Sequence, residues 1–180
     1  MEEWIYETSS DNSARYLLGL KVQNPLICIG VNPSTASPDK LDNTLKSVDR
    51  FSRYLGYDGW IMMNLYPQRA TYPDDIHHQM NIELHDQNIA TIEKIMFIQD
   101  RLTIWAAWGN LIEKREFLNQ CLQDIYMIST KYSCEWINIG KISKNGHPHH
   151  PLYLNKNAEL NKFDIESYML KLKGLSQSMK

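Results

Sequence analysis

Hydrophobic residues gather in four short runs along the chain, each bounded by polar or turn-forming residues. The runs are Leu26–Val31, Trp60–Tyr66, Leu102–Trp108 and Trp136–Ile139. Mainly apolar runs of this length are typical of strands that are buried on both faces of a parallel sheet. The pattern therefore predicts four strands at the centre of the fold.

Between these runs, apolar residues recur at the spacing of amphipathic helices. A short edge strand over Arg15–Leu20 and a closing helix over Phe163–Leu172 complete the predicted elements. Alternating strands and helices favour an α/β fold, here a three-layer sandwich with a central, mainly parallel four-stranded sheet. The three apolar helix faces consist of Leu41, Leu45, Val48, Phe51 and Leu55, of Ile89, Ile92, Ile95 and Met96, and of Leu111, Leu118, Cys121 and Leu122.

The chain has 180 residues, enough for one domain with a substantial core and too few for two. We expect a single α/β domain over residues 1–180, with its core at about 15–172 and a frayed tail at 174–180. No stretch has the length of a transmembrane helix, and the acidic start Met1-Glu2-Glu3 does not resemble a signal peptide. No membrane partner is therefore expected.

Charge and cysteine content bear on partners and compartment. The formal net charge is -2 at pH 7, so no global positive field marks a nucleic-acid-binding protein. Cys28, Cys121 and Cys134 lack metal-ligand spacing and lie in or beside apolar or amphipathic runs. We interpret them as buried, reduced thiols, which favours a cytoplasmic protein.

Residues that directly follow the predicted parallel strands should converge on one edge of the sheet, where open α/β sheets bind ligands. These segments are residues 32–35, 67–69, 109–110 and 140–153. All are largely polar, and each contains glycine or proline. The sequence thus predicts at which edge of the sheet a ligand binds, but this pattern does not identify the ligand.

The turn after the first core strand is the most informative part of this edge. Gly30 permits a tight turn, Pro33 stiffens it, and the amide of Asn32 can both donate and accept hydrogen bonds. Asn32 either positions a water or a base-like ligand, or bonds its own turn. Ser34 and Thr35 either bind a phosphate or cap a helix. Neither the dinucleotide-binding nor the P-loop glycine pattern is present.

Four other residues are candidates near the same edge. Asp42 precedes the first long helix, so it either caps that helix, the favoured interpretation, or faces the ligand. Asn64 lies near the end of the second run, and Arg69 follows it. An arginine there holds a phosphate or carboxylate, or ties down its loop by bonding backbone carbonyls. Trp108 lines a pocket or, as we favour, packs in the core.

The loop over residues 141–153 holds three of the six histidines within four positions. A metal site formed by His147, His149 and His150 is the less favoured interpretation, because adjacent histidines do not readily face one ion and no familiar ligand spacing is present. Phosphate contacts with an apolar tip for stacking or wedging are the alternative, as is a stiff surface loop. The loop's candidate contact residues are Lys144, His147, His150, Leu152 and Tyr153.

Seven motifs in a fixed order resemble an uncharacterised bacterial and phage family, domain of unknown function 1643. They are Arg15-Tyr16-Leu17-Leu18, GVNPSTA, Asp42-Asn43-Thr44, GYDGW, NLYPQRAT, AAWG and GHPHHPLY. The resemblance extends from about Arg15 to Tyr153. This family carries no known activity.

A more distant resemblance is to uracil-DNA glycosylases, which are parallel-sheet α/β domains. Gly30-Val31-Asn32-Pro33 is similar to the first motif of their mismatch-specific branch, and His150-Pro151-Leu152 is partly similar to their second motif. Trp108-Gly109 is similar to the end of a glycosylase core strand. The resemblance implies a flipped base in a pocket, a water positioned by Asn32, a departing base stabilised by His150 and a wedge formed by Leu152.

The glycosylase motifs do not account for Asp42, Thr44, Asn64 or Arg69, which would suit a small nucleotide with its phosphate on Arg69. We therefore expect a nucleobase- or nucleotide-binding protein of glycosylase-like fold that hydrolyses an N-glycosidic bond in DNA or a nucleotide. The alternative is a non-catalytic module that binds or sequesters a nucleotide or modified base. The expected partner is nucleic acid or a free nucleotide, no metal or cofactor is expected, and both monomer and homodimer remain open.

Overall fold

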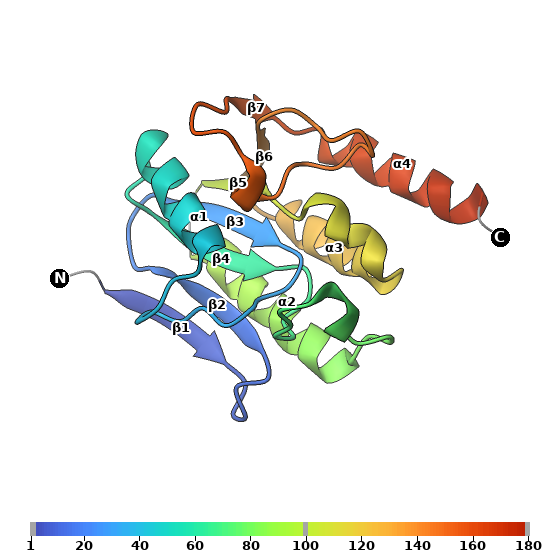
Figure 1. Cartoon of the computed structure of the whole chain (residues 1–180), viewed down its shortest axis with the longest axis horizontal. Coiled ribbons are helices and arrows are strands. Elements are labelled where there is room, and N and C mark those ends of the chain that lie inside the picture. Colours follow the sequence, from blue (N-terminus) through green and yellow to red (C-terminus); the bar gives the residue numbers. More distant parts are fainter. Residues whose placement is uncertain (1–2, 99–100, 179–180) are drawn as a thin grey trace.

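The computed structural model describes residues 3–98 and 101–178 and has an α/β fold built on one mixed sheet (Figure 1). Within the described residues the sheet has seven strands in the order β1-β2-β4-β3-β5-β6-β7. The strands are β1 (Trp4–Thr8), β2 (Arg15–Leu20), β3 (Pro25–Gly30), β4 (Gly59–Asn64), β5 (Leu102–Ala106), β6 (Cys134–Ile139) and β7 (Leu160–Lys162).

Strand direction divides this sheet into a parallel centre and antiparallel flanks. β3 pairs in parallel with both β4 and β5, and β5 pairs in parallel with β6. β1, β2 and β7 each pair antiparallel with their neighbours. The predicted four-stranded sheet is therefore too small, and β2 is an internal strand between β1 and β4 rather than an edge.

The two edge strands escaped prediction because their side chains carry little burial signal. β1 is only partly buried, and all of β7 is exposed. Both strands are defined by backbone pairing with a neighbour, which leaves no apolar run in the sequence. The four central strands, in contrast, are largely or wholly buried.

Helices cover both faces of the sheet and complete three layers (Figure 1). α1 (Asn43–Tyr54) packs Leu45, Val48 and Phe51 on one face. α2 (Ile82–Phe97), α3 (Phe117–Ser129) and α4 (Ile165–Ser178) pack on the other. Three short 3-10 helices are η1 (Pro73–Asp75), η2 (Gly109–Lys114) and η3 (Pro151–Tyr153).

Two predicted helical segments differ from the observed ones in their bounds. The apolar face over 111–122 belongs to two elements, η2 and α3, because an extended backbone at Arg115 separates them. α4 continues to Ser178, into the segment expected to be frayed; residues 179–180 lie outside the described residues. No helix within 3–98 or 101–178 is both long and apolar enough to cross a membrane.

Close packing of β2 on β4 depends on a glycine and can be tested by substitution. A Cβ on Gly19 would lie 2.5 Å from the carbonyl oxygen of Trp60 and 2.7 Å from Cα of Ile61. Because these are backbone atoms that cannot rotate away, we expect Gly19→Ala to lower the free energy of unfolding by about 1–3 kcal/mol in urea denaturation.

Gly174 is the matched control, since it lies in α4 and a Cβ added to it would meet no neighbouring heavy atom within 4 Å. Gly174→Ala should be neutral or stabilise the protein by up to about 1 kcal/mol through helix propensity. Equal effects of the two substitutions would contradict this account of the β2–β4 contact.

Candidate functional site

A cavity of about 340 Å³ opens at the carboxyl ends of β3 and β4. The residues that line it come from the turn after β3, the start of α1, the end of β4, the segment 70–73 and the histidine-rich loop, among others. The predicted site residues that it brings together are Gly30, Asn32, Pro33, Ser34, Asp42, Asn64 and His150. The other lining residues are Arg15, Val31, Asn43, Thr44, Leu45, Met62, Ala70, Thr71, Pro73 and Leu111.

The most unusual group in this cavity is the side chain of Asn64. It is 1% exposed, and neither its Oδ1 nor its Nδ2 has a hydrogen-bond partner among the described residues. Gly30 is its register partner on β3, and a Cβ on Gly30 would lie 3.1 Å from Asn64 Oδ1 and 2.7 Å from Met62 Cε. Only glycine avoids crowding the amide at this position, and the amide itself has both its donor and its acceptor unpaired.

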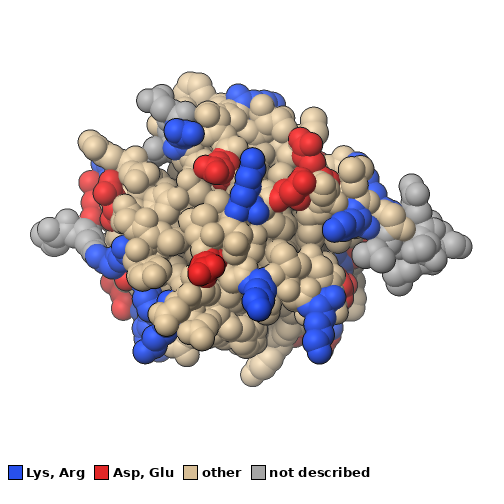
Figure 2. Space-filling model, turned by 90° about the horizontal axis from the view of Figure 1, so that it is seen from above, with Lys and Arg blue, Asp and Glu red and all other residues tan. Residues whose placement is uncertain are grey.

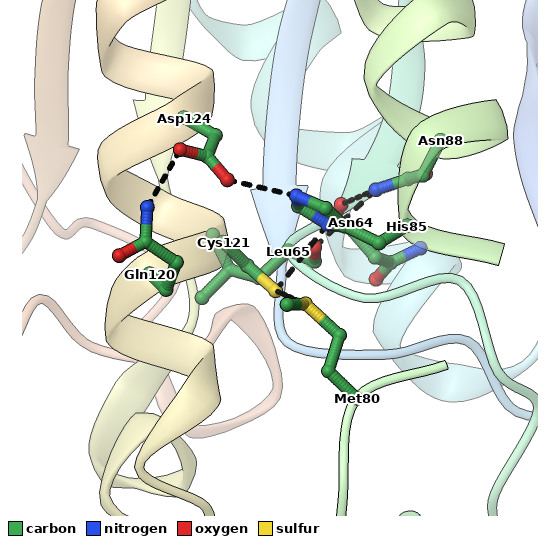
Figure 3. Close-up of polar contacts among 8 residues, drawn as sticks. All are labelled: Asn64, Leu65, Met80, His85, Asn88, Gln120, Cys121 and Asp124. Atoms are coloured by element: carbon green, nitrogen blue, oxygen red, sulfur yellow. Dashed lines mark hydrogen bonds and ion pairs between the residues drawn. The ribbon is translucent and has the colours of Figure 1, made fainter. Parts of the chain in front are cut away.

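Hydrogen bonds from α2 hold the backbone at Asn64 in place (Figure 3). Nδ2 of the buried Asn88 donates to the carbonyl oxygens of Asn64 (2.9 Å) and Leu65 (3.3 Å). These bonds hold the end of β4, so the Asn64 side chain is presented from a rigid element.

One turn before Asn88, a buried polar cluster joins α2 to α3 (Figure 3). His85 Nε2 lies 2.8 Å from Asp124 Oδ2, and His85 Nδ1 lies 3.6 Å from Cys121 Sγ. Burial, reinforced by Asp124, raises the pKa of the Cys121 thiol to about 12. The thiol is therefore protonated at neutral pH, and the cluster acts as a structural link between the helices.

Asn32 has an anchored side and a free side. Its Nδ2 donates to the carbonyl oxygens of Pro33 (3.0 Å) and Ala70 (2.9 Å), which ties the turn after β3 to the segment after β4. Because the nitrogen must face these carbonyls, the orientation of the amide is fixed. Oδ1 has no hydrogen-bond partner within the described part of the chain, so it is available as an acceptor in the cavity wall.

His150 enters the cavity from the loop before η3. Ser47 of α1 donates to the carbonyl oxygen of Pro151 (2.9 Å), and the backbone at Gly109 approaches His150 closely enough that a Cβ there would lie 3.2 Å from His150 Cβ. Nδ1 of His150 accepts a hydrogen bond from the backbone N–H of Leu152 (3.2 Å). This bond places the proton of the neutral ring on Nε2, which makes that atom a donor.

Burial lowers the pKa of His150 from its ordinary value, while the carboxylate of Asp42 opposes that shift. His150 is therefore neutral at pH 7. Asp42 itself caps α1, since its Oδ1 accepts from the backbone N–H of Leu45 (2.9 Å), and it also lines the cavity. The cap and the ligand-facing position, considered as alternatives from the sequence, coincide at this residue.

Arg69 and Thr35 lie outside the set of cavity-lining residues. Arg69 bonds the carbonyl oxygens of Ser34 and Ala36, which is the loop-tying arrangement considered from the sequence. Its remaining contacts are to Tyr6 Oη (2.7 Å) and Asn12 Oδ1 (3.2 Å). Thr35 is exposed.

The candidate site residues of the histidine-rich loop lie in three different places: the core, the surface and the cavity. His147 is buried, with Nδ1 2.7 Å from Tyr168 Oη and Nε2 2.7 Å from Glu113 Oε1. Trp108, fully buried, donates from Nε1 to the same Tyr168 oxygen (2.9 Å). This hydrogen-bonded chain fastens the loop to η2 and α4. The exposed candidates are Lys144, Leu152 and Tyr153.

Arg15 is the main cavity residue that the sequence analysis did not select. It occupies the first position of β2 and is 2% exposed, although the rest of that strand is apolar. An arginine at the start of an otherwise apolar strand is an unusual residue in the sequence, but its place beside this cavity depends on how β2 pairs with β4. Among the described residues, no group of three or more His, Cys, Asp or Glu side chains is arranged to hold a metal ion.

Comparison with known proteins gives one match. Residues 15–152 match the model of the family DUF1643, described as a protein of unknown function. No curated protein and no solved structure matches the chain. The family expected from the seven motifs is confirmed, whereas the resemblance to uracil-DNA glycosylases stays a prediction.

Replacement of Asn64 tests whether its amide is unsatisfied in the free protein. Asn64→Leu conserves shape and removes two buried polar atoms without partners, so we expect the free energy of unfolding to rise by about 1–2 kcal/mol in urea denaturation. Asn138 is the matched control, because it is also buried but donates to the carbonyl oxygen of Gly140 (2.7 Å). Asn138→Leu should destabilise the protein; destabilisation by both substitutions would show that Asn64 is satisfied.

The burial of His150 predicts a pH dependence of stability. The unfolded chain binds a proton at the ordinary value of 6.5, whereas the folded protein binds it only at lower pH. The unfolded state therefore holds more protons than the folded state as the pH falls below about 6.5, and the free energy of unfolding decreases there.

The substitution His150→Asn tests this, because asparagine retains an acceptor for the Leu152 N–H. In denaturation between about pH 5 and 7.5, His150→Asn should lose less stability with acid than the wild type; equal slopes would contradict the shift.

Proposed function

The chain belongs to the DUF1643 family, and we propose that it binds a nucleobase or nucleotide in this cavity and hydrolyses the N-glycosidic bond. The observation that carries the proposal is the buried, doubly unpartnered amide of Asn64. A glycosylase-like arrangement of the fold is part of the same proposal, and its support is the resemblance of the motifs at Asn32, Trp108 and His150.

An amide with both polar atoms available favours a ligand that offers a donor and an acceptor side by side in one plane. Each buried polar group left without a partner costs about 1–3 kcal/mol, so the ligand gains affinity by supplying both hydrogen bonds. Nucleobases carry such paired edges. Because Gly30 has no Cβ that would crowd Asn64 Oδ1, no side chain at position 30 covers that side of the amide.

Asn32 supplies the group for the water. Its anchored Nδ2 leaves Oδ1 as an acceptor in the cavity wall, suited to holding a water by one of its protons. In the proposed step, the water oxygen forms a bond to the sugar carbon while the bond from that carbon to the base nitrogen breaks. The electron pair leaves with the base, and the proton released by the water goes to solvent or to the base.

His150 supplies the group for the departing base. A neutral imidazole with its proton on Nε2 donates a hydrogen bond without adding a competing acceptor at that atom. Burial of the ring strengthens this interaction with the negative charge that develops on the base. The reaction then needs no carboxylate base in contact with the water.

A binding module without catalysis is the second candidate, and the anchoring of Asn32 favours it. Its Nδ2 bonds join two loops whether or not a water is present, so the residue has a structural role of its own. Under this candidate the cavity retains an intact nucleotide or modified base.

Mass spectrometry distinguishes the two candidates. The protein is incubated with uracil-containing, deaminated and hypermodified oligonucleotides and with free nucleotides, and released base is measured. We expect Asn32→Ala to lower turnover by roughly 100-fold or more while binding persists. Retention of an intact ligand without released base, in the wild type, would favour the binding module.

Asn32→Asp is the matched control, because it keeps an acceptor oxygen but removes the Nδ2 donor that anchors the loops. This variant should retain more activity than Asn32→Ala even where its thermal stability is lower. Equal loss of activity in both variants would assign Asn32 to loop anchoring and refute its role in positioning the water.

A further inference from the structure

Arg15 places an incompletely paired positive charge in the cavity wall. Its side chain is 2% exposed and, within the described residues, makes one hydrogen bond, from Nη1 to the carbonyl oxygen of Ala36 (3.2 Å). Its Nε is buried without a partner. A guanidinium has five N–H donors, and a buried cation is stable only when a charge or several acceptors compensate it.

The surroundings of Arg15 do not supply that compensation in full. Nη1 of Arg69 donates to the same Ala36 carbonyl oxygen (3.3 Å), so two guanidiniums converge on one neutral acceptor. The other partners of Arg69 are also neutral. Asp42 attracts Arg15, but one of its oxygens is used to cap α1.

The groups that shift the pKa of Arg15 also indicate a local excess of positive charge. Burial and the repulsion from Arg69 lower the pKa of Arg15 to about 10, and Asp42 opposes this shift. Arg15 is nevertheless a cation at neutral pH. The first residues of α1, Asn43 and Thr44, also line the cavity, and the positive end of the helix dipole adds to the attraction for an anion.

Resting on the proposed function, we infer that Arg15 forms an anion subsite in the same cavity as Asn64, and that the ligand is a free nucleotide whose terminal phosphate binds there. The planar guanidinium fork matches phosphate oxygens in a bidentate arrangement. The phosphate supplies acceptors for the unpartnered donors of Arg15, while the base supplies both hydrogen bonds to Asn64. A cavity of about 340 Å³ lies at the lower end of the usual range for small-molecule sites, about 300–1,000 Å³.

Three observations favour a terminal phosphate over the backbone of a nucleic acid. Arg15 is buried, whereas a phosphodiester must leave its contact in two directions. On the face seen in Figure 2, Lys and Arg are scattered among Asp and Glu rather than gathered into a basic stripe. The net charge of -2 likewise gives little general attraction for a polyanion.

Calorimetric titration tests the inference with nucleosides, their 5′-monophosphates, inorganic phosphate and short single-stranded oligonucleotides carrying the same bases. We expect the monophosphate of the preferred base to bind about 10- to 100-fold more tightly than its nucleoside. Arg15→Met should reduce this advantage to within about twofold and leave nucleoside affinity within about threefold of the wild type. Arg101→Met is the matched control, since Arg101 is exposed before β5, at the opposite end of the strands, and should leave both affinities unchanged.

The outcomes separate the subsite from the proposed function. Nucleoside binding without any gain from the phosphate in the wild type overturns the anion subsite and leaves the proposed function standing; this comparison needs no variant, so it holds even if Arg15→Met does not fold. Tighter binding of the oligonucleotide than of the monophosphate overturns the free-nucleotide assignment. If inorganic phosphate binds in an Arg15-dependent manner but no base-containing ligand binds, the subsite is supported and the proposed function fails.

Discussion

The parallel register of β3 against β4 is the constraint on which the cavity depends. It pairs Gly30 with Asn64 at the carboxyl ends of the two strands. The pairing continues past both strands, because the backbone N–H groups of Leu65 and Tyr66 donate to the carbonyl oxygens of Gly30 and Val31. A shift of one residue would turn the side chain of Asn64 to the opposite face of the sheet. The position of the amide and the glycine that lies beside it thus have one origin in the backbone ladder.

Much of the fold and part of the cavity follow from local sequence patterns. The four apolar runs locate β3, β4, β5 and β6; Asn32 lies in the turn after β3, and Asn64 is the last residue of β4. The position of Arg15 does not follow from the same rule. It begins β2, which runs antiparallel to β4, so the start of β2 lies at the edge where the parallel strands end. Only the pairing of distant strands reveals this, and no local pattern encodes it.

The positions of loop residues likewise cannot be predicted from the local sequence alone. Three histidines within four positions have one sequence signature, yet His147 turns inward to Tyr168 and Glu113 while His150 lines the cavity. Their assignments depend on contacts with α4, η2 and α1, which are distant in the sequence. The two arginines differ for the same reason: neutral groups of the β1–β2 turn and the 34–36 turn surround Arg69, whereas Arg15 is left with one carbonyl.

The distribution of unsatisfied polar atoms links stability to binding. Among the described residues, six buried side-chain atoms have no hydrogen-bond partner, and three of them belong to Asn64 and Arg15, which line the same cavity. The other three are spread over Ser52, Asn88 and Trp105. Unpartnered polar atoms destabilise a fold, and solvent or the proposed ligand would compensate for their concentration in one wall. A ligand that brings a planar donor–acceptor edge and an anion would satisfy all three atoms at once, and its binding would stabilise the folded chain by the same interactions.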